Sequence, residues 1–466
     1  MLVEIQGSAA ETVSADLLAV PVRAGGPPLV ARLAELVERD AKTEAGASLV
    51  VYGDGVAARR VALVGVGEGR PDELRTAAAV AVRAAGGGTV AWAFDPGLPA
   101  WQVEAVVEGA ILGGYDPGRW KTSGRASVER FVVAGAPTDS ADAAARAAIV
   151  ARWTNRAREL VDTPPNELTP SGLAAAAGDL LSPLGVRVES LGPEEILGLG
   201  MGGLAAVGGG SANEPRLVVL RYGEGTPALG LVGKSITFDS GGYFLKQQAD
   251  IVRQKADMGG GAAVVGAIGA IAELGLGIDV IGVLPAAENM LGGAAFRPGD
   301  ILRTAAGLTV EVTNPDAEGR IVMADALWYA RREGARRLVD VATLTGAMRA
   351  AMGDMYLGVF ANDDDWRDQI VDAGNASGDH AWPWPLPGRY ARLLDSQLAD
   401  IKNTSGRSFG YPIIAAAFLE RFAGELPWAH LDIYSVAFLD DDRDYFARGA
   451  TGAGVRLLAE LARRLA

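Results

Sequence analysis

Short apolar runs alternate with longer stretches rich in Ala, Glu and Arg along nearly the whole chain. Runs such as LLAVPV (17–22) and RVALVGVG (60–67) suit buried strands, and ELRTAAAVAVRAAG (73–86) suits a helix. Alternation of strand and helix is typical of a mostly parallel sheet covered by helices. The sequence therefore predicts the α/β fold class. In the first third of the chain, the expected strands are 17–22, 48–53, 60–67, 89–94 and 130–135, and the expected helices are 27–41 and 73–86.

A long helical segment, 140–160, follows this part and ends at the sequence VDTPPNELTPSG. Pro164 and Pro165 stop a helix because proline lacks the backbone donor, and Thr169-Pro170-Ser171 is a typical helix start. A chain of 466 residues also exceeds the usual size of one domain. We therefore expect an N-terminal domain over 1–145, a helical linker over 146–168 and a second domain over 169–466.

Apolar runs in the second part are more continuous, as in RLVVLRY (216–222) and DVIGVLPA (279–286). Continuous apolar strands are usually covered on both faces. We therefore expect a smaller N-terminal α/β domain and a larger C-terminal α/β domain with a mixed, mostly parallel central sheet. The expected strands here are 216–222, 228–233, 279–286, 309–314, 337–346 and 428–438, and the expected helices are 259–275 and 324–335.

Composition narrows the function classes. A net charge of −14 argues against general nucleic-acid binding and against binding to anionic membranes. With no Cys and only two His, the chain has no disulfides or thiolate sites. The N-terminal segment MLVEIQGSAAETVSADLL carries acids where an export signal needs positive charge, and no apolar run reaches the roughly 18–20 residues of a membrane-spanning helix. We expect a cytoplasmic protein.

Candidate metal ligands cluster where expected strands end. Asp239 follows the run ALGLVGKSITF, Asp316 and Glu318 follow TVEVTN, and Asp257 precedes a Gly-rich helix start. In open α/β sheets, sites assemble at the carboxyl ends of the strands. Four converging carboxylates would repel one another, and divalent cations are the natural remedy. The cations Lys234, Lys246 and Arg320 lie within the same segments.

Two other motifs are weighed and set aside. Gly233-Lys234-Ser235 resembles the end of a phosphate-binding loop, but the required opening glycine falls on Ala228. The segment FDSGG around Ser240 resembles a serine-protease loop and would need His380 or His430 as its base. His430 lies in an expected buried strand and His380 in a polar loop, so a structural role is expected for each.

Several segments together resemble the leucyl (cytosol) aminopeptidase family, the two-metal M17 peptidases. The resemblance covers essentially all of residues 155–460, which would make the C-terminal domain the catalytic one. The N-terminal region is similar only in general pattern. The segments that carry the resemblance are GKSITFDSGGYFLK (233–246), KADMGGGAA (255–263), AENMLGGAAFRPGD (287–300), NPDAEGR (314–320) and DVATLTGA (340–347), supported by VDTPPNELTPSGL (161–173), ADIKN (399–403) and WAHLDI (428–433).

The resemblance implies a two-metal site. Asp239 and Glu318 would bridge the ions, Lys234 and Asp257 would complete the tighter site, and Asp316 would complete the more exchangeable one. A ligating lysine must be neutral, and two dications lower its pKa. Such ligands suit Zn, Mn, Mg or Co; we expect Mn or Zn.

The resemblance also implies catalytic roles. A water held by the metals would attack the scissile carbonyl of a peptide or dipeptide. Lys246 would stabilise the developing oxyanion. Arg320 would hold a bicarbonate ion in place of a general base. Asn314, Leu344 and Gly346 would contact the substrate.

The chain departs from the family pattern at several positions. Ser235 stands where Gly is usual, Pro315 where Thr is usual and Gln247 where Pro is common. In the pocket for the first side chain, Gln254 stands where family members often have Met, and Tyr434 and Ala437 replace parts of an Ala-Gly and Met pattern. A Gln amide left unpaired in an apolar pocket costs about 1–3 kcal/mol. We therefore predict a side-chain preference shifted away from leucine.

The sequence leaves three candidate functions open. The first is an aminopeptidase that releases N-terminal residues from peptides or dipeptides. The second is a specialised paralogue that processes a peptide-like metabolite. The third is a non-catalytic scaffold or DNA-architectural protein, which the full ligand set and the acidic charge disfavour. By resemblance, the chain would form a homohexamer.

Overall fold

The computed structural model describes residues 1–26, 29–53, 55–124 and 126–466. The chain divides into two compact units, residues 1–155 with 439–449, and residues 156–438 with 450–466. The division falls within the long helix α4 (Ala141–Asp162). No described helix has the length and apolarity to cross a bilayer.

The N-terminal unit contains a six-stranded sheet in the order β1-β6-β5-β2-β4-β3. All neighbours are parallel except β3 and β4. Because side chains alternate along a strand, Leu17 and Ala19 of β2 face a core that includes α2 and α3, and Leu18 and Val20 face the opposite core. The strands are β1 (Leu2–Gln6), β2 (Leu17–Val22), β3 (Ser48–Tyr52), β4 (Arg60–Gly65), β5 (Gly88–Ala93) and β6 (Val128–Ala134), with helices α1 (Ala34–Asp40), α2 (Pro71–Ala85) and α3 (Ala100–Gly113).

The predicted helix over 27–41 is wrong in its first part. Residues 27 and 28 lie outside the described residues, and Val30 is extended, with φ −123°. A short 3-10 turn, Ala31–Leu33, then leads into α1, which begins at Ala34. The β-branched Val30 favours extended backbone, so the helix starts later than its polarity pattern suggests.

The C-terminal unit contains a nine-stranded sheet in the order β16-β15-β18-β14-β9-β11-β8-β7, with β10 also paired to β11. The predicted mixed, mostly parallel sheet is confirmed. The pairs β10–β11, β9–β11, β9–β14, β14–β18 and β15–β16 are parallel, and the pairs β8–β11, β7–β8 and β15–β18 are antiparallel. The strands are β7 (Arg187–Leu191), β8 (Arg216–Tyr222), β9 (Leu229–Gly233), β10 (Ser235–Asp239), β11 (Val280–Asn289), β14 (Leu338–Ala342), β15 (Leu357–Ala361), β16 (Ala381–Pro383) and β18 (Trp428–Asp432).

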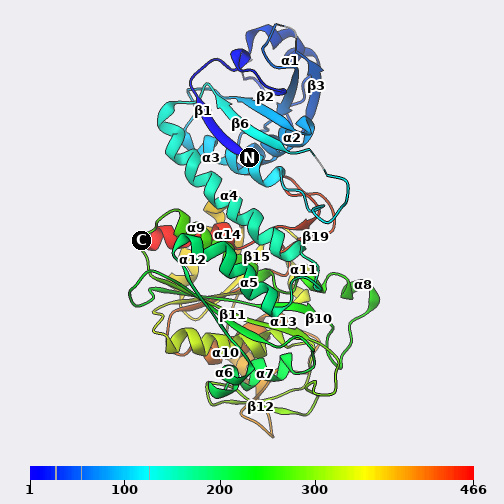
Figure 1. Cartoon of the computed structure of the whole chain (residues 1–466), viewed down its shortest axis with the longest axis vertical. Helices are drawn as coiled ribbons and strands as arrows, with labels where there is room; N and C mark the ends of the chain where they lie inside the picture. Colours follow the sequence, from blue (N-terminus) through cyan, green and yellow to red (C-terminus); the bar gives the residue numbers. More distant parts are fainter. Residues whose placement is uncertain (27–28, 54, 125) are drawn as a thin grey trace. The chain divides into compact units, whose positions relative to one another are not determined.

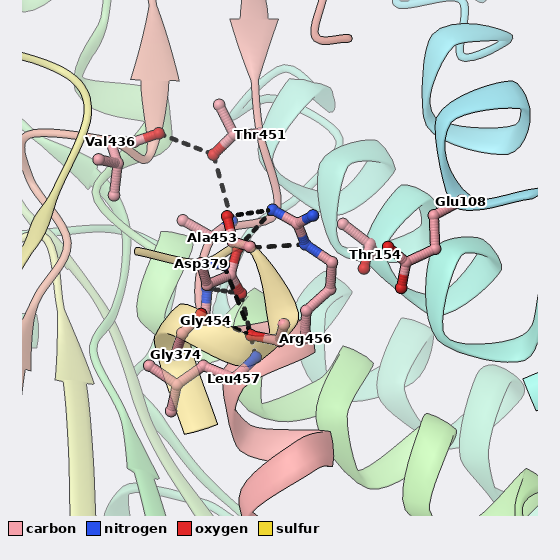
Figure 2. Close-up of polar contacts among 12 residues, drawn as sticks. Glu108, Thr154, Gly374, Asp379, Val436, Thr451, Ala453, Gly454, Arg456 and Leu457 are labelled. Atoms are coloured by element: carbon pink, nitrogen blue, oxygen red, sulfur yellow. Dashed lines mark hydrogen bonds and ion pairs between the residues drawn. The ribbon is translucent and has the colours of Figure 1, made fainter. Parts of the chain in front are cut away.

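Helices cover both faces of this sheet (Figure 1). One layer holds α9, α12 and α14, and the other holds α6, α7 and α10. Asp379 fixes the start of α14, since its carboxylate accepts the backbone N–H groups of Gly454 and Leu457 and pairs with buried Arg456 (Figure 2). The helices are α5 (Pro170–Leu181), α6 (Pro193–Gly198), α7 (Gly202–Gly208), α8 (Gln248–Ile251), α9 (Gly259–Glu273), α10 (Gly319–Arg332), α11 (Gly346–Met352), α12 (Asp364–Ser377), α13 (Tyr411–Ala423) and α14 (Val455–Leu465).

Helix α5 begins as predicted: Thr169 accepts the N–H of Gly172 at 3.1 Å, and Pro170 is the first helical residue. Several predicted strands are shorter than expected; the one predicted over 337–346, for example, is β14, Leu338–Ala342. The strand predicted over 428–438 ends at Asp432, because the Asp432 carboxylate accepts the N–H of Tyr434 and starts a turn. The strand predicted over 309–314 is β13 (Thr309–Glu311), which pairs with β12 (Ile301–Arg303) and β17 (Ile401–Lys402).

Candidate metal centre and active site

The structure brings the five predicted metal ligands together in the C-terminal unit. Lys234 lies between β9 and β10, and Asp239 is the last residue of β10. Asp257 follows a 3-10 turn just before α9, and Glu318 directly precedes α10. Carboxylate oxygens of Asp239, Asp316 and Glu318 lie within 4.8 Å of one another.

Two lysines lie among these carboxylates. The Lys234 ammonium is 2.7 Å from Asp257 Oδ2 and 3.0 Å from Glu318 Oε1. The Lys246 ammonium is 2.7 Å from Asp239 Oδ2 and also contacts Asp316. The predicted oxyanion-stabilising lysine therefore lies against the predicted metal ligands.

Neighbouring side chains orient the carboxylates. Asn289 Nδ2 donates to Asp239 Oδ1 at 2.8 Å, and Thr343 Oγ1 donates to Asp257 Oδ1 at 2.7 Å. Each contact uses one carboxylate oxygen and leaves the other beside a lysine ammonium. The sequence does not single out Asn289 and Thr343 as neighbours of the predicted ligands, although both lie inside segments that carry the family resemblance.

A second group of contacts shapes the loop before α10. Asn403 Oδ1 accepts the N–H of Thr313 at 2.8 Å, and its Nδ2 donates to the carbonyl of Asn314 at 2.6 Å. Asn314 Oδ1 in turn accepts the N–H of Asp316 at 2.8 Å. The structure thus gives the Asn314 side chain a loop-forming contact that places Asp316.

The electrostatics of the cluster are those of crowded, buried acids. Burial and the charge of Glu318 raise the pKa of Asp239 to about 7. Burial also raises the pKa of Asp257 well above its ordinary value and raises that of Asp316. Burial opposes ionisation of Glu318, but the charges of Lys234 and Lys246 outweigh it and lower the pKa. The nearby carboxylates likewise raise the pKa of both lysines against the effect of burial.

This donor set fits divalent metal ions. The buried oxygens Asp257 Oδ2, Glu318 Oε1 and Asp316 Oδ1 contact lysine ammonium groups, and the buried Glu318 Oε2 has no hydrogen-bond donor in the described part of the chain. Such atoms need a cation, and in this structure lysine ammonium groups lie next to several of them. Four carboxylates and one amine form a set suited to Mn, Zn, Mg or Co.

Arg320 lies in the first turn of α10 and is 3% exposed. One guanidinium nitrogen donates to the carbonyl of Asn403 at 2.8 Å, while its Nε has no hydrogen-bond partner among the described residues. Burial lowers the pKa of Arg320 to about 10. A buried cation with an unused donor is a suitable seat for a small anion.

The predicted pocket residues line one cavity that includes Asp257 and has about 350 Å³ of free space when its open mouth is included. Gln254, Tyr434 and Ala437 contribute to its wall, together with Arg253 and Phe438. Leu344 and Gly346 lie nearby: the Leu344 N–H contacts Asp432, and an added Cβ at Gly346 would lie 3.7 Å from the Tyr434 ring.

The rejected motifs do not form their alternative sites. The Ser240 hydroxyl donates to the carbonyl of Asn289, and His430 Nδ1 lies 2.5 Å from Asp340 Oδ1 in the sheet interior. Lys234 contacts carboxylates, in place of the phosphate that a phosphate-binding loop would hold.

Comparison with known proteins decides the family. The model of the cytosol aminopeptidase family catalytic domain matches residues 155–459, and that of the N-terminal domain matches residues 29–124. The chain belongs to the cytosol aminopeptidase family. It is therefore a metal-dependent aminopeptidase, a hydrolase.

Relatives match over most of their length. A probable cytosol aminopeptidase of Solibacter usitatus is 45% identical over 427 residues, covering 89% of each chain. One from Streptomyces coelicolor is 40% identical and covers 98% of this chain and 97% of its own. Among solved structures, the bottromycin maturation enzyme BotP superposes with a TM-score of 0.89 at 37% identity, covering 97% of this chain and 99% of its own. A structure of BotP in complex with Mn has the same TM-score and 36% identity.

Proposed function

We propose that the chain releases the N-terminal residue of peptides or dipeptides at a site where Lys234, Asp239, Asp257, Asp316 and Glu318 hold two divalent ions. The observation that carries this proposal is the convergence of three carboxylate oxygens within 4.8 Å, in a buried acid cluster whose charge is balanced in this structure by the ammonium groups of Lys234 and Lys246. The chemistry that such ions supply when bound is polarisation of a carbonyl group and of water.

The side chains around the ions have separate roles. Lys246, which touches the same carboxylates, stabilises negative charge on the carbonyl oxygen of the substrate. Arg320 holds bicarbonate through its unused donor, and the anion takes protons in place of a histidine base. Leu344, Gly346 and Asn314 border the substrate main chain.

We propose Mn or Zn as the native metal. The oxygen-rich donor set suits both, and the BotP structure in complex with Mn supports the first. A metal-stripped sample, reloaded with Mn or Zn and assayed against aminoacyl-nitroanilides and dipeptides, tests the proposal. Turnover that depends on metal is expected; no turnover across the panel would reject it.

The cavity beside Asp257 is proposed as the pocket for the first side chain. Gln254 is 8% exposed, so its amide is a nearly buried polar group in the wall. Polar side chains should be preferred over leucine, because the Gln254 amide makes the pocket wall more polar than a methionine would. The test compares the native chain with a Gln254→Met variant on substrates that begin with Gln, Met or Leu. The variant should hydrolyse the leucine substrate faster than the native chain does.

A specialised peptide-like substrate is the second candidate. BotP, named for bottromycin maturation, matches this chain across nearly its whole length. We also propose a cytoplasmic location, in line with the names of the relatives, and a homohexameric assembly. Light scattering should then give a mass near six times 48.1 kDa.

A further inference from the structure

A second pocket, with about 540 Å³ of free space when its open mouth is included, lies in the N-terminal unit, far along the sequence from the metal ligands. Its wall includes Pro21 of β2, Val66 just after β4, and Trp92 to Asp95 at the end of β5. The cavity therefore lies at the carboxyl ends of three parallel strands.

The topology makes this position a natural binding crevice. From β2, the chain continues toward β3 and β4 on one side, and from β5 it continues to β6 on the other side. The connections after β2 and β5 thus leave in opposite directions, although the two strands are neighbours. Ligands of open α/β sheets bind at such points, outside the carboxyl ends of the strands.

Three polar side chains reach an otherwise mainly apolar wall that includes Leu74 and Val106. Gln102 is 6% exposed, and its amide makes no hydrogen bond within the described residues. Arg23 is half-buried and has no ion pair or side-chain hydrogen bond in the described part of the chain. The Asp95 carboxylate accepts the N–H of Gly97 through one oxygen, Oδ1.

The position of Arg23 is well defined by its neighbours. An added Cβ at Gly69 would lie 2.3 Å from an Arg23 guanidinium nitrogen, so the side chain packs against the turn before α2. The helix start itself offers less to an anion, because the Glu73 carboxylate already accepts the N–H groups of Glu68 and Arg70. Arg23 is therefore the cation of this wall.

We propose that this cavity binds a small organic anion with an apolar body, with Arg23 holding the charged group and Gln102 and Asp95 the polar edge. The Gln102 amide has no partner within the described residues, so the polar edge of a ligand can pair with it without breaking an existing hydrogen bond. Apolar walls with a few converging polar groups are typical of small-molecule sites. The site is separate from the peptidase centre and needs no metal.

Two matched probe pairs test the proposal on the full chain: indole-3-acetate against indole-3-acetamide, and adenosine monophosphate against adenosine. Ligand-observed NMR and calorimetry would give the dissociation constants. The anion of at least one pair should bind roughly 10-fold or more tightly than its neutral partner, the gain from a charge-assisted hydrogen bond. No binding of either anion at about millimolar concentration, or equal binding within both pairs, overturns the proposal.

Variants locate the binding. Arg23→Gln should remove the preference for the anion, and Gln102→Leu should weaken both members of a pair by roughly 3- to 10-fold. Arg119→Gln removes the same charge at an exposed position outside the cavity and should change nothing. If Arg23→Gln and Arg119→Gln change the preference for the anion to the same extent, the proposed position of the site is wrong. Binding of the anion should persist after chelation of metals. This result would show that the pocket does not depend on the proposed metal site.

Discussion

At the scale of single residues, Thr343 supports the proposed metal centre through its bond to Asp257. Thr343→Val should lower metal affinity by roughly 10- to 100-fold, since partners that orient ligands have effects of this size. Metal content by mass spectrometry after dialysis at graded free Mn measures it. Thr154→Val removes a hydroxyl bond of similar length within α4 and should leave the affinity unchanged.

Lys246 should affect the reaction more than the metal content. Lys246→Met removes the cation next to Asp239 and Asp316, and kcat should fall by roughly 10²- to 10³-fold, as for other lost oxyanion donors. Steady-state kinetics at saturating Mn, with metal content measured in parallel, tests this. A variant with normal kcat would show that Lys246 only balances charge.

The acid cluster predicts a pH dependence. Because the pKa of Asp239 is raised to about 7 from 3.8, the folded metal-free chain keeps this proton up to neutral pH. A metal ion must displace it together with the proton of Lys234, so affinity should rise more steeply with pH below 7 than above 7, where only the lysine proton is still displaced. The stability of the metal-free chain changes in the opposite direction. The protonated Asp239 carboxyl stabilises the folded state at low pH, and this contribution to the free energy of unfolding is lost as pH rises through 7. Calorimetric titrations from pH 5.5 to 8.5 measure the slope, and Asp239→Asn should flatten it.

At the scale of elements, the Gly-rich start of α9 positions Asp257. An added Cβ at Gly260 would lie 2.0 Å from the carbonyl oxygen of Val341, in β14. Gly260→Ala should therefore destabilise the C-terminal unit by about 1–3 kcal/mol and reduce metal binding. Gly178→Ala, in α5, has open space and should be neutral or stabilising. Denaturant unfolding with and without Mn compares the two.

Particular elements show where sequence reasoning succeeds and where it stops. The sequence predicts which acids and lysines come together because they lie in short contiguous motifs beside apolar strands. It does not single out Asn403, because the loop-forming contacts of Asn403 join residues about 90 positions apart in the chain. The start of α1 was misplaced because polarity patterns do not report the extended backbone at Val30.

At the scale of the whole molecule, the two units should respond differently to metal. Ligands stabilise only the parts whose folded form binds them, by about 2.7 kcal/mol at one hundred times the dissociation constant. Hydrogen exchange should slow on addition of Mn around β10, the start of α9 and the start of α10, and should not change in β2, β4 and β5. Equal slowing in both units would contradict a metal centre confined to residues 156–438.

The return segment, residues 439–449, has a consequence for how the protein is made. Its side chains Leu439, Tyr445 and Phe446 are buried in the same apolar cluster as Trp92 and Phe131. During translation, the first unit lacks these side chains until nearly the entire chain has left the ribosome. A fragment that stops before residue 439 should therefore fold poorly, although it contains every strand of the N-terminal sheet.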